Sequence, residues 1–153
     1  MLDLKLKIPP LLLTLLFGLA MWVISESSVL IEIPVVVSLC LSFALFTLGA
    51  TVLISAVVSF RFAKTTVNPL LPSESTVLVK SGVYKFSRNP MYLGFLLFLF
   101  AFGILLGDVK PLFIVPLFFS YMTIFQIIPE ERALQGLFGN EYKQYQREVR
   151  RWL

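Results

Sequence analysis

Two short polar segments of this chain carry the residue types that binding chemistry needs. The first, Arg88 to Gly94 (RNPMYLG), combines an arginine, an amide and a tyrosine with a proline and a glycine that shape the backbone. The second holds two adjacent carboxylates, Glu130 and Glu131. Arginine pairs with anions, carboxylates accept hydrogen bonds, and a tyrosine face attracts cations. Brought together, such groups could bind a polar cofactor.

Other kinds of chemistry are excluded by what the sequence lacks. It has no histidine and one cysteine, Cys40, in the middle of an apolar run. Disulfides within the chain, zinc sites of the usual Cys/His kind and histidine-based acid–base catalysis are therefore excluded, and we expect no metal site. Cys40 is expected to be an inert apolar thiol, since no basic partner accompanies it.

The composition places these segments in a membrane protein. Of 153 residues, 58% are hydrophobic and 14% are charged, whereas a soluble domain carries about 45–50% apolar and about 25% charged residues. Only helices are plausible for crossing a bilayer with such long apolar runs. We therefore predict one all-α polytopic membrane domain over residues 1–153.

Four apolar runs are predicted to be transmembrane helices, since each approaches or exceeds the ~17–25 residues that a spanning helix needs. They leave a loop over 61–90 and a tail over 129–153. The four runs are residues 8–24, 34–60, 91–107 and 111–128.

The basic residues predict the orientation of these spans. All but one of the thirteen lysines and arginines fall on one side, which carries Lys5 and Lys7, the 61–90 loop with Lys64, and the tail; the exception is Lys110. The positive-inside rule then places both termini and the long loop in the cytosol, and a bacterial inner membrane is expected. The charges are scattered, so they favour membrane lipids and not nucleic acid as partners.

A short connection brings the two polar segments together. Only Asp108, Val109 and Lys110 join the third and fourth runs, which must form a tight antiparallel hairpin. The start of the third run and the end of the fourth therefore share one cytosolic rim. A cofactor site on that rim would also admit a lipid-soluble substrate from the bilayer. Taken singly, Arg88 could be an inside-positive anchor and the two glutamates could complement a helix dipole.

The segments flanking this rim also have recognisable patterns. The apolar stretch Thr76–Lys80 must pack somewhere. Pro129 marks a new helix start or a kinked continuation, and Gly139 and Asn140 a break. The apolar residues that follow recur at three-four spacing and predict a short amphipathic helix suited to a membrane surface. These residues are Tyr142, Tyr145, Val149 and Trp152.

Both segments resemble motifs of the isoprenylcysteine carboxyl methyltransferase and phospholipid methyltransferase superfamily. Residues 84–94 (YKFSRNPMYLG) resemble its R-[HN]-P-x-Y-x-G signature, and residues 130–152 resemble its E-E-x-x-L…F-G-x-x-Y-x-x-Y…R-W tail. Many relatives have histidine at the position of Asn89. The resemblance implies S-adenosylmethionine (SAM) as cofactor, held in a cytosolic pocket that the C-terminal amphipathic helix closes.

The resemblance also implies which residues form that pocket. Arg88 would bind the cofactor's carboxylate, and Glu130 or Glu131 its ammonium or ribose hydroxyls. Arg88 and Glu131 are the predicted catalytic residues; Glu131 or bound water would accept a proton from an amine, whereas a carboxylate nucleophile needs no base. The predicted cofactor-binding residues are Tyr84, Arg88, Asn89, Pro90, Tyr92, Gly94, Glu130, Glu131, Tyr142 and Tyr145.

Several functions stay open at this point. Carboxyl O-methylation of an isoprenylcysteine-like lipid leads, and N-methylation of an aminophospholipid is the alternative. An NADPH-binding enzyme similar to sterol reductases is a third reading, although few basic residues are available for the extra phosphates. A scaffold without enzymatic activity is a fourth. The sequence does not predict the oligomeric state.

Overall fold

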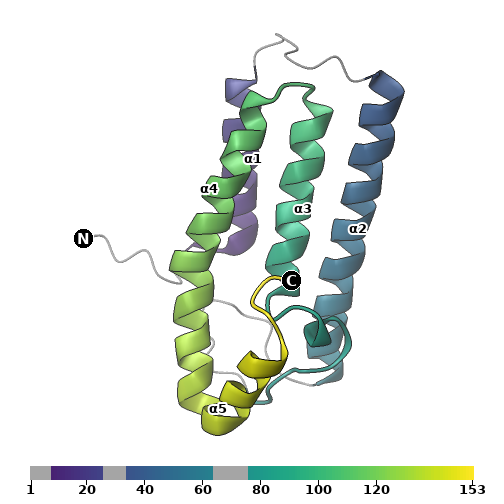
Figure 1. The fold of residues 1–153 in the computed structure, drawn as a ribbon. Helices are drawn as coiled ribbons and strands as arrows, with labels where there is room; N and C mark the ends of the chain where they lie inside the picture. The colour runs from purple at the N-terminus through teal and green to yellow at the C-terminus, as the bar shows by residue number, and fades with distance from the viewer. Residues whose placement is uncertain (1–7, 26–33, 64–75) are drawn as a thin grey trace, which may run out of the picture.

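The computed structural model describes residues 8–25, 34–63 and 76–153; Lys5, Lys7 and Lys64 lie outside these ranges. The described residues form helices and no strand, which confirms the all-α prediction (Figure 1). The elements are α1 (Pro10–Ile24), α2 (Val35–Phe62), η2 (Gly82–Lys85), α3 (Pro90–Leu105), η3 (Lys110–Phe113), α4 (Ile114–Tyr121), η4 (Met122–Ile127) and α5 (Ile128–Glu148).

Each predicted apolar run is helical, but the helices differ in length. Two are long and apolar enough to cross a membrane: α2, and the continuous helix Lys110–Glu148 that contains α4 and α5. The apolar helices α1 and α3 have 15 and 16 residues and fall short of that length. Crossing by all four helices stays a prediction.

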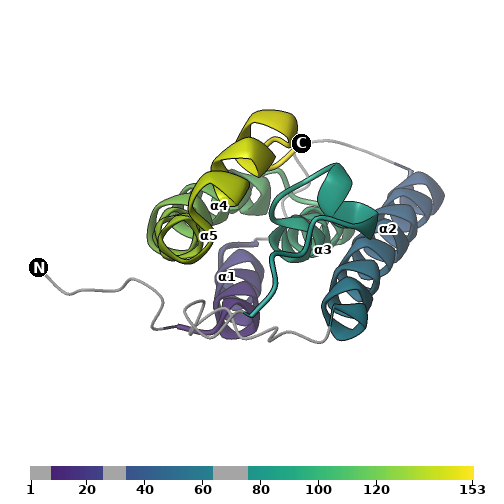
Figure 2. The same ribbon diagram turned by 90° about the horizontal axis from the view of Figure 1, so that it is seen from below.

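Helix α3 lies at the centre of the bundle, with α2 on one side and the pair α1 and α4 on the other (Figure 2). Small residues allow α2 and α3 to approach closely. A Cβ on Gly94 would lie 2.9 Å from the Gly49 carbonyl oxygen, and one on Gly49 would lie 3.0 Å from that of Gly94. Ser42, Gly49 and Ala56 are the buried residues of α2, at a seven-residue spacing. This spacing keeps a narrow face of α2 against α3.

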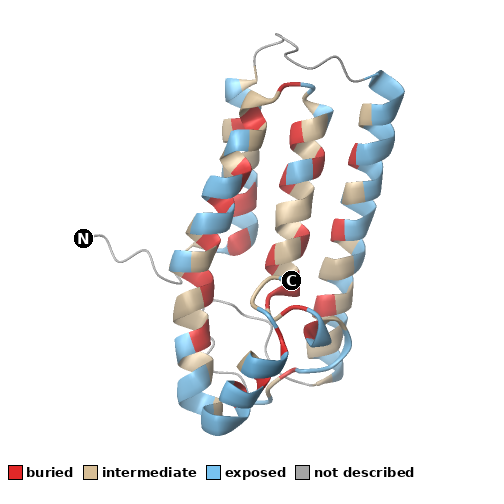
Figure 3. Ribbon diagram, viewed as in Figure 1, coloured by how far each residue is buried: buried red, intermediate tan, exposed pale blue. Residues whose placement is uncertain are grey.

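The apolar core lies where α1, α3 and α4 meet. Leu13, Met21, Leu99 and Phe118 are all at most 3% exposed there. The outward faces are also apolar: Val35 and Phe43 of α2 are each 73% exposed. Figure 3 shows that much of α2 is exposed. Large apolar side chains on the outside of a bundle are expected where the surrounding medium is lipid.

The element η4 is a π-helical turn at Met122–Ile127, directly before Pro129. Proline has no N–H, and in an α-helix its ring would clash with the carbonyl of Phe125. The wider turn before Pro129 lets the helix continue without a break. Within it, fully buried Gln126 donates through Nε2 to the carbonyl of Ile8 at 2.8 Å, which ties the start of α1 to this turn.

Candidate cofactor site

The first segment of the candidate site is a short loop between η2 and α3. Gly82 begins η2 with φ of 61°, a conformation that glycine adopts readily. At the other end, the Ser87 hydroxyl accepts the N–H of Asn89 at 3.1 Å, and Pro90 occupies the first turn of α3. A proline at this position is favourable because the N–H it lacks would have no helical partner. The loop thus presents Arg88 at the entrance to α3.

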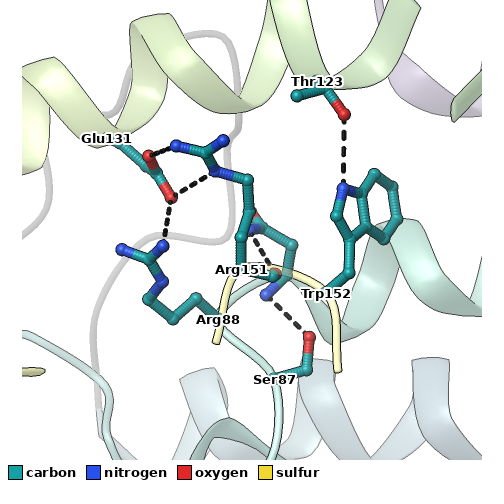
Figure 4. A network of polar contacts seen from close by, with 7 residues as sticks. Ser87, Arg88, Thr123, Glu131, Arg151 and Trp152 are labelled. Carbon is teal, nitrogen blue, oxygen red and sulfur yellow. Dashed lines mark hydrogen bonds and ion pairs between the residues drawn. The ribbon is translucent and has the colours of Figure 1, made fainter. Parts of the chain in front are cut away.

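Arg88 joins a buried cluster of charged side chains from three parts of the chain (Figure 4). Its Nη2 lies 3.2 Å from Glu131 Oε1, and both side chains are only 9% exposed. Arg151 approaches the same carboxylate with Nη2 at 2.7 Å from Oε2 and Nε at 3.1 Å from Oε1. The cluster holds two guanidinium groups and one carboxylate, so it carries an excess positive charge.

Two nitrogens of Arg88 have no hydrogen-bond partner among the residues that the structure describes. Both Nε and Nη1 are buried and unpaired there. Leaving a buried donor unpaired costs about 1–3 kcal/mol, more for a charged group. Such an arrangement is expected where a ligand completes the bonding, and an anionic ligand would suit it best.

The tail after α5 is the third part of the cluster. Helix α5 ends at Glu148, and Val149 is extended with φ of −125° and ψ of 133°. The N–H of Arg88 donates to the carbonyl of Arg150 at 3.0 Å, and Asn89 Nδ2 donates to the carbonyl of Arg151 at 2.9 Å. Asn89 thus holds the tail through an amide, which does not titrate, at the position where many relatives have histidine.

Trp152 anchors the end of the tail on the long helix. Its ring stacks on Phe119 with centroids 4.7 Å apart, and its Nε1 donates to Thr123 Oγ1 at 3.2 Å (Figure 4). The predicted place of Trp152 on an amphipathic helix is therefore wrong. The helix ends before it, because the backbone of the tail pairs with the loop that holds Arg88.

A second pair lies on the same rim. The Tyr92 hydroxyl donates to Glu130 Oε2 at 2.8 Å, which joins the first turn of α3 to the start of α5. Glu130 lies beyond the apolar part of its helix. Burial, with a smaller contribution from the negative charge of Glu131, raises the pKa of Glu130 to about 7, and the Tyr92 hydrogen bond opposes the rise. A carboxyl group with this pKa changes its charge near neutral pH.

The three other tyrosines of the predicted site, Tyr84, Tyr142 and Tyr145, are buried beside this rim. The Tyr145 hydroxyl donates to the carbonyl of Tyr84 at 2.7 Å, and the Tyr84 ring packs edge-on against Phe60. Burial raises the pKa of Tyr142, and the charges of Glu131 and Arg88 also act on its hydroxyl. The charge of Arg88 lowers the pKa of both Tyr142 and Tyr145 against the effect of burial, so both lie near the charged cluster, and Tyr145 also holds the loop in place.

The segment after Gly139 packs against the protein itself. Gly139 has φ of 51° and ψ of −118° and kinks α5, which confirms the predicted break. Tyr142, Tyr145 and Val149 form a buried cluster with Leu78, Leu134 and Phe138. Their apolar face is therefore not free for a membrane surface as we expected. Val79, from the predicted apolar stretch, is buried against Ala56 and Tyr84.

Gly94 and Pro90 contribute to the site in a different way. Gly94 contacts α2 at Gly49 and Leu53, so its place in the motif is explained by helix packing. Pro90 is buried at the start of α3. A cavity of about 240 Å³ lies at the opposite end of the bundle, between Val35 and Ser38 of α2, Ile104 in the last turn of α3, and Asp108 beyond it. It is remote from Arg88.

Arg151 and Trp152 were not among the predicted site residues. Both belong to the R-W part of the tail motif, which was a signal for their importance. No pattern within the tail predicted that Arg151 would reach Glu131, because that contact depends on the extended course of the chain after Glu148.

The chain belongs to the phospholipid methyltransferase family. The family model matches residues 37–141, which is more than half of the chain and includes Arg88, Tyr92, Glu130 and Glu131.

The relatives include proteins from a bacterium and two yeasts. The chain is 43% identical over 63 residues to an uncharacterized protein of Haemophilus influenzae, covering 41% of this chain and 100% of that protein. It is 43% identical over 75 residues to a protein-S-isoprenylcysteine O-methyltransferase of Saccharomyces cerevisiae, covering 48% of this chain and 30% of the enzyme. Its identity to the enzyme of that name from Schizosaccharomyces pombe is 32% over 73 residues, covering 48% and 31%.

The chain thus matches less than a third of the length of each yeast enzyme. No solved structure matches it.

Proposed function

We propose that this protein is a membrane methyltransferase that transfers the methyl group of SAM to a lipophilic acceptor. One observation carries the proposal: within the region that matches this family, the buried Arg88 keeps two nitrogens, Nε and Nη1, without a partner among the described residues. The cluster around Arg88 has excess positive charge, so an anionic group is the expected partner. The carboxylate of SAM is such a group.

The surrounding residues fit the other parts of this cofactor. Glu130 suits the ammonium or the ribose hydroxyls, since among the described residues its carboxyl group accepts one hydrogen bond, from Tyr92. The charge of Arg88 acts on the pKa of Tyr142, so the two side chains lie near each other. A tyrosine face suits adenine or a cationic sulfonium. Glu131 has both oxygens in ion pairs, so we assign it the role of orienting Arg88.

Bound SAM supplies a methyl group that is already activated by the sulfonium. The protein then has to align the acceptor with that carbon and exclude water, which can supply much of the rate. Arg88 and Glu130 would fix the two polar ends of the amino-acid part. The apolar core beside Tyr92 would exclude water from the same place.

The leading acceptor is a carboxylate on an isoprenylcysteine-like lipid. The names of the two yeast relatives support it, and the matched region of each includes about half of this chain. A carboxylate nucleophile is ionised at neutral pH and needs no general base. The family's description supports a second acceptor, the amine of a phospholipid. An amine must lose a proton, which bound water would accept, because Glu131 has both oxygens in ion pairs and Glu130 is assigned to the cofactor.

We also propose that all four apolar helices cross the membrane, with the Arg88 rim in the cytosol. At 1.5 Å per residue, α1 and α3 are each about 23 Å long, so flanking residues must complete their passage through a core of about 30 Å. The exposed large apolar side chains of α1 and α2 support this arrangement. An acceptor lipid would then reach the rim sideways from the bilayer.

Isothermal titration of the detergent-purified protein with S-adenosylhomocysteine tests the cofactor. Wild type should bind, and Arg88→Ala should lower the affinity at least tenfold. Lys80→Ala is the matched control, because Lys80 forms an exposed ion pair with Glu141. Binding of NADPH but not of S-adenosylhomocysteine would overturn the proposal, as would unchanged binding by Arg88→Ala. Transfer of a radiolabelled methyl group to a prenylcysteine or to phosphatidylethanolamine then identifies the acceptor.

A further inference from the structure

The charged cluster is asymmetric in the way that Glu131 is shared. Arg151 forms two parallel contacts with the carboxylate, from Nη2 to Oε2 at 2.7 Å and from Nε to Oε1 at 3.1 Å. Arg88 reaches the same carboxylate with Nη2 alone, at 3.2 Å. Figure 4 shows both guanidinium groups directed at the Glu131 carboxylate. Arg151 therefore holds the stronger pairing.

This asymmetry decides how much of Arg88 is available to a ligand. A guanidinium and a carboxylate prefer the two-bond geometry, and buried N–H groups without partners are unfavourable. Without Arg151, Glu131 would be free to turn toward Arg88 and form the two-bond pair with it. Arg88 would then be neutralised and would offer fewer donors to an anion.

We propose that Arg151 is a positioning residue for cofactor binding. By holding Glu131 in a two-bond pair, it keeps Nε and Nη1 of Arg88 available for the cofactor's carboxylate. The cluster also retains one positive charge in excess, which attracts an anion. This inference rests on the proposed function, since it takes SAM as the ligand of Arg88.

The tail is built to hold Arg151 in this position. The carbonyl of Arg151 accepts a hydrogen bond from Nδ2 of the buried Asn89. The carbonyl of Arg150 accepts one from the backbone N–H of Arg88. Trp152, the residue after Arg151, is fixed by its contacts with Phe119 and Thr123. The Arg151 side chain is itself 37% exposed, against 9% for Glu131, so it reaches the buried carboxylate from the outer side of the cluster. Asn89 thereby contributes to the site through the backbone of the tail.

A double-mutant cycle tests the inference with S-adenosylhomocysteine as the titrated ligand. Arg151→Ala should weaken binding at least tenfold, because Glu131 is released to neutralise Arg88. The double variant Arg151→Ala/Glu131→Gln should recover most of the affinity and bind within about threefold of Glu131→Gln alone. The reason is that a neutral amide at position 131 cannot form an ion pair with Arg88. Arg147→Ala is the control, because Arg147 is an exposed cation at the end of α5.

A purely structural role for Arg151 predicts the opposite interaction, because losing both partners would then weaken binding at least as much as losing Arg151 alone. That result, or wild-type affinity in Arg151→Ala, would overturn the inference while leaving the proposed function intact. A wild-type protein that does not bind would overturn both. Should Arg151→Ala not yield folded protein, Arg151→Lys serves in the same cycle, since lysine keeps the charge but cannot form the two-bond pair.

Discussion

The Tyr92 hydroxyl lies 2.8 Å from Glu130 Oε2, and this hydrogen bond joins the first turn of α3 to the start of α5. The two residues come from the two motifs that stand 38 positions apart in the sequence. Their contact places a carboxyl group with a pKa of about 7 beside the apolar core. Glu130 is thus a group whose charge responds to pH near neutrality.

Cofactor binding should therefore depend on pH. Because the pKa of Glu130 is raised to about 7, the group is mostly neutral at pH 6 and ionised above pH 7. The ionised form attracts the ammonium of S-adenosylhomocysteine, so affinity should rise by up to roughly eightfold between pH 6 and pH 7.5. Isothermal titration across this range measures the change.

Glu130→Gln should bind more weakly at pH 7.5 and show a flat profile. Tyr92→Phe should move the rise to higher pH, because it removes the hydrogen bond that lowers the pKa of Glu130. If Glu130→Gln kept the wild-type pH dependence, another group would be responsible and this role of Glu130 would be wrong.

The contact between α2 and α3 should be sensitive to one added methyl group. In Gly94→Ala, the new Cβ would lie 2.9 Å from the Gly49 carbonyl oxygen and 3.0 Å from Leu53 Cβ. The helices must move apart, and overpacking of this kind costs about 1–3 kcal/mol. The midpoint of thermal unfolding in detergent should fall accordingly.

Gly136→Ala is the matched control for this change. Gly136 is also helical, and a Cβ there would meet nothing within 4 Å. Because alanine favours a helix over glycine, this variant should be as stable as wild type or slightly more so. Equal destabilisation of both variants would show that close helix packing is not the reason for Gly94.

Removal of the Trp152 side chain should release the tail. Trp152→Ala loses the stack on Phe119 and the hydrogen bond to Thr123. The tail holds Arg151 against Glu131, so affinity for S-adenosylhomocysteine should fall about three- to tenfold. Leu153→Ala is the control, since Leu153 is 70% exposed.

Limited proteolysis gives a second measurement of this change. We expect trypsin to cut after Arg150 or Arg151 faster in Trp152→Ala than in wild type, because an undocked segment is more accessible. Identical cleavage rates with unchanged binding would mean that Trp152 does not hold the tail.

The proposed orientation can be measured with single cysteines. In a Cys40→Ser background, Gln144→Cys lies on the exposed side of α5, and Lys110→Cys lies at the hairpin between α3 and α4. A membrane-impermeant maleimide should label residue 144 only from the cytosolic side and residue 110 only from the opposite side. If both cysteines were labelled from the same side, residues 110 and 144 would lie on one side of the membrane and the proposed orientation would be wrong.

The helices and the meeting of the two motifs were predictable from the sequence for physical reasons. An apolar run must satisfy its own backbone hydrogen bonds in lipid, so its length already predicts a helix. The short connection through Asp108 forces α3 and α4 to run antiparallel. Arg88 and Glu131 therefore had to lie on the same rim, and the structure places them 3.2 Å apart.

The course of the tail and the packing of the amphipathic segment were not predictable in this way. The spacing of Tyr142, Tyr145 and Trp152 matches a helix, but Trp152 follows an extended Val149 and packs on Phe119. These contacts join residues that are far apart in the chain, so the local spacing of apolar residues could not predict them. An apolar face also looks the same in sequence whether lipid or protein covers it.

The π-helical turn Met122–Ile127 has a consequence for how related sequences should be compared. Each residue of an α-helix rotates the chain by about 100°, and a π turn accommodates one residue more than an α turn. A homologue that lacks one residue here could keep both glutamates of the motif and still direct them away from Arg88. In this part of the chain, a one-residue gap in an alignment therefore changes the direction in which Glu130 and Glu131 point, even where every motif letter is retained.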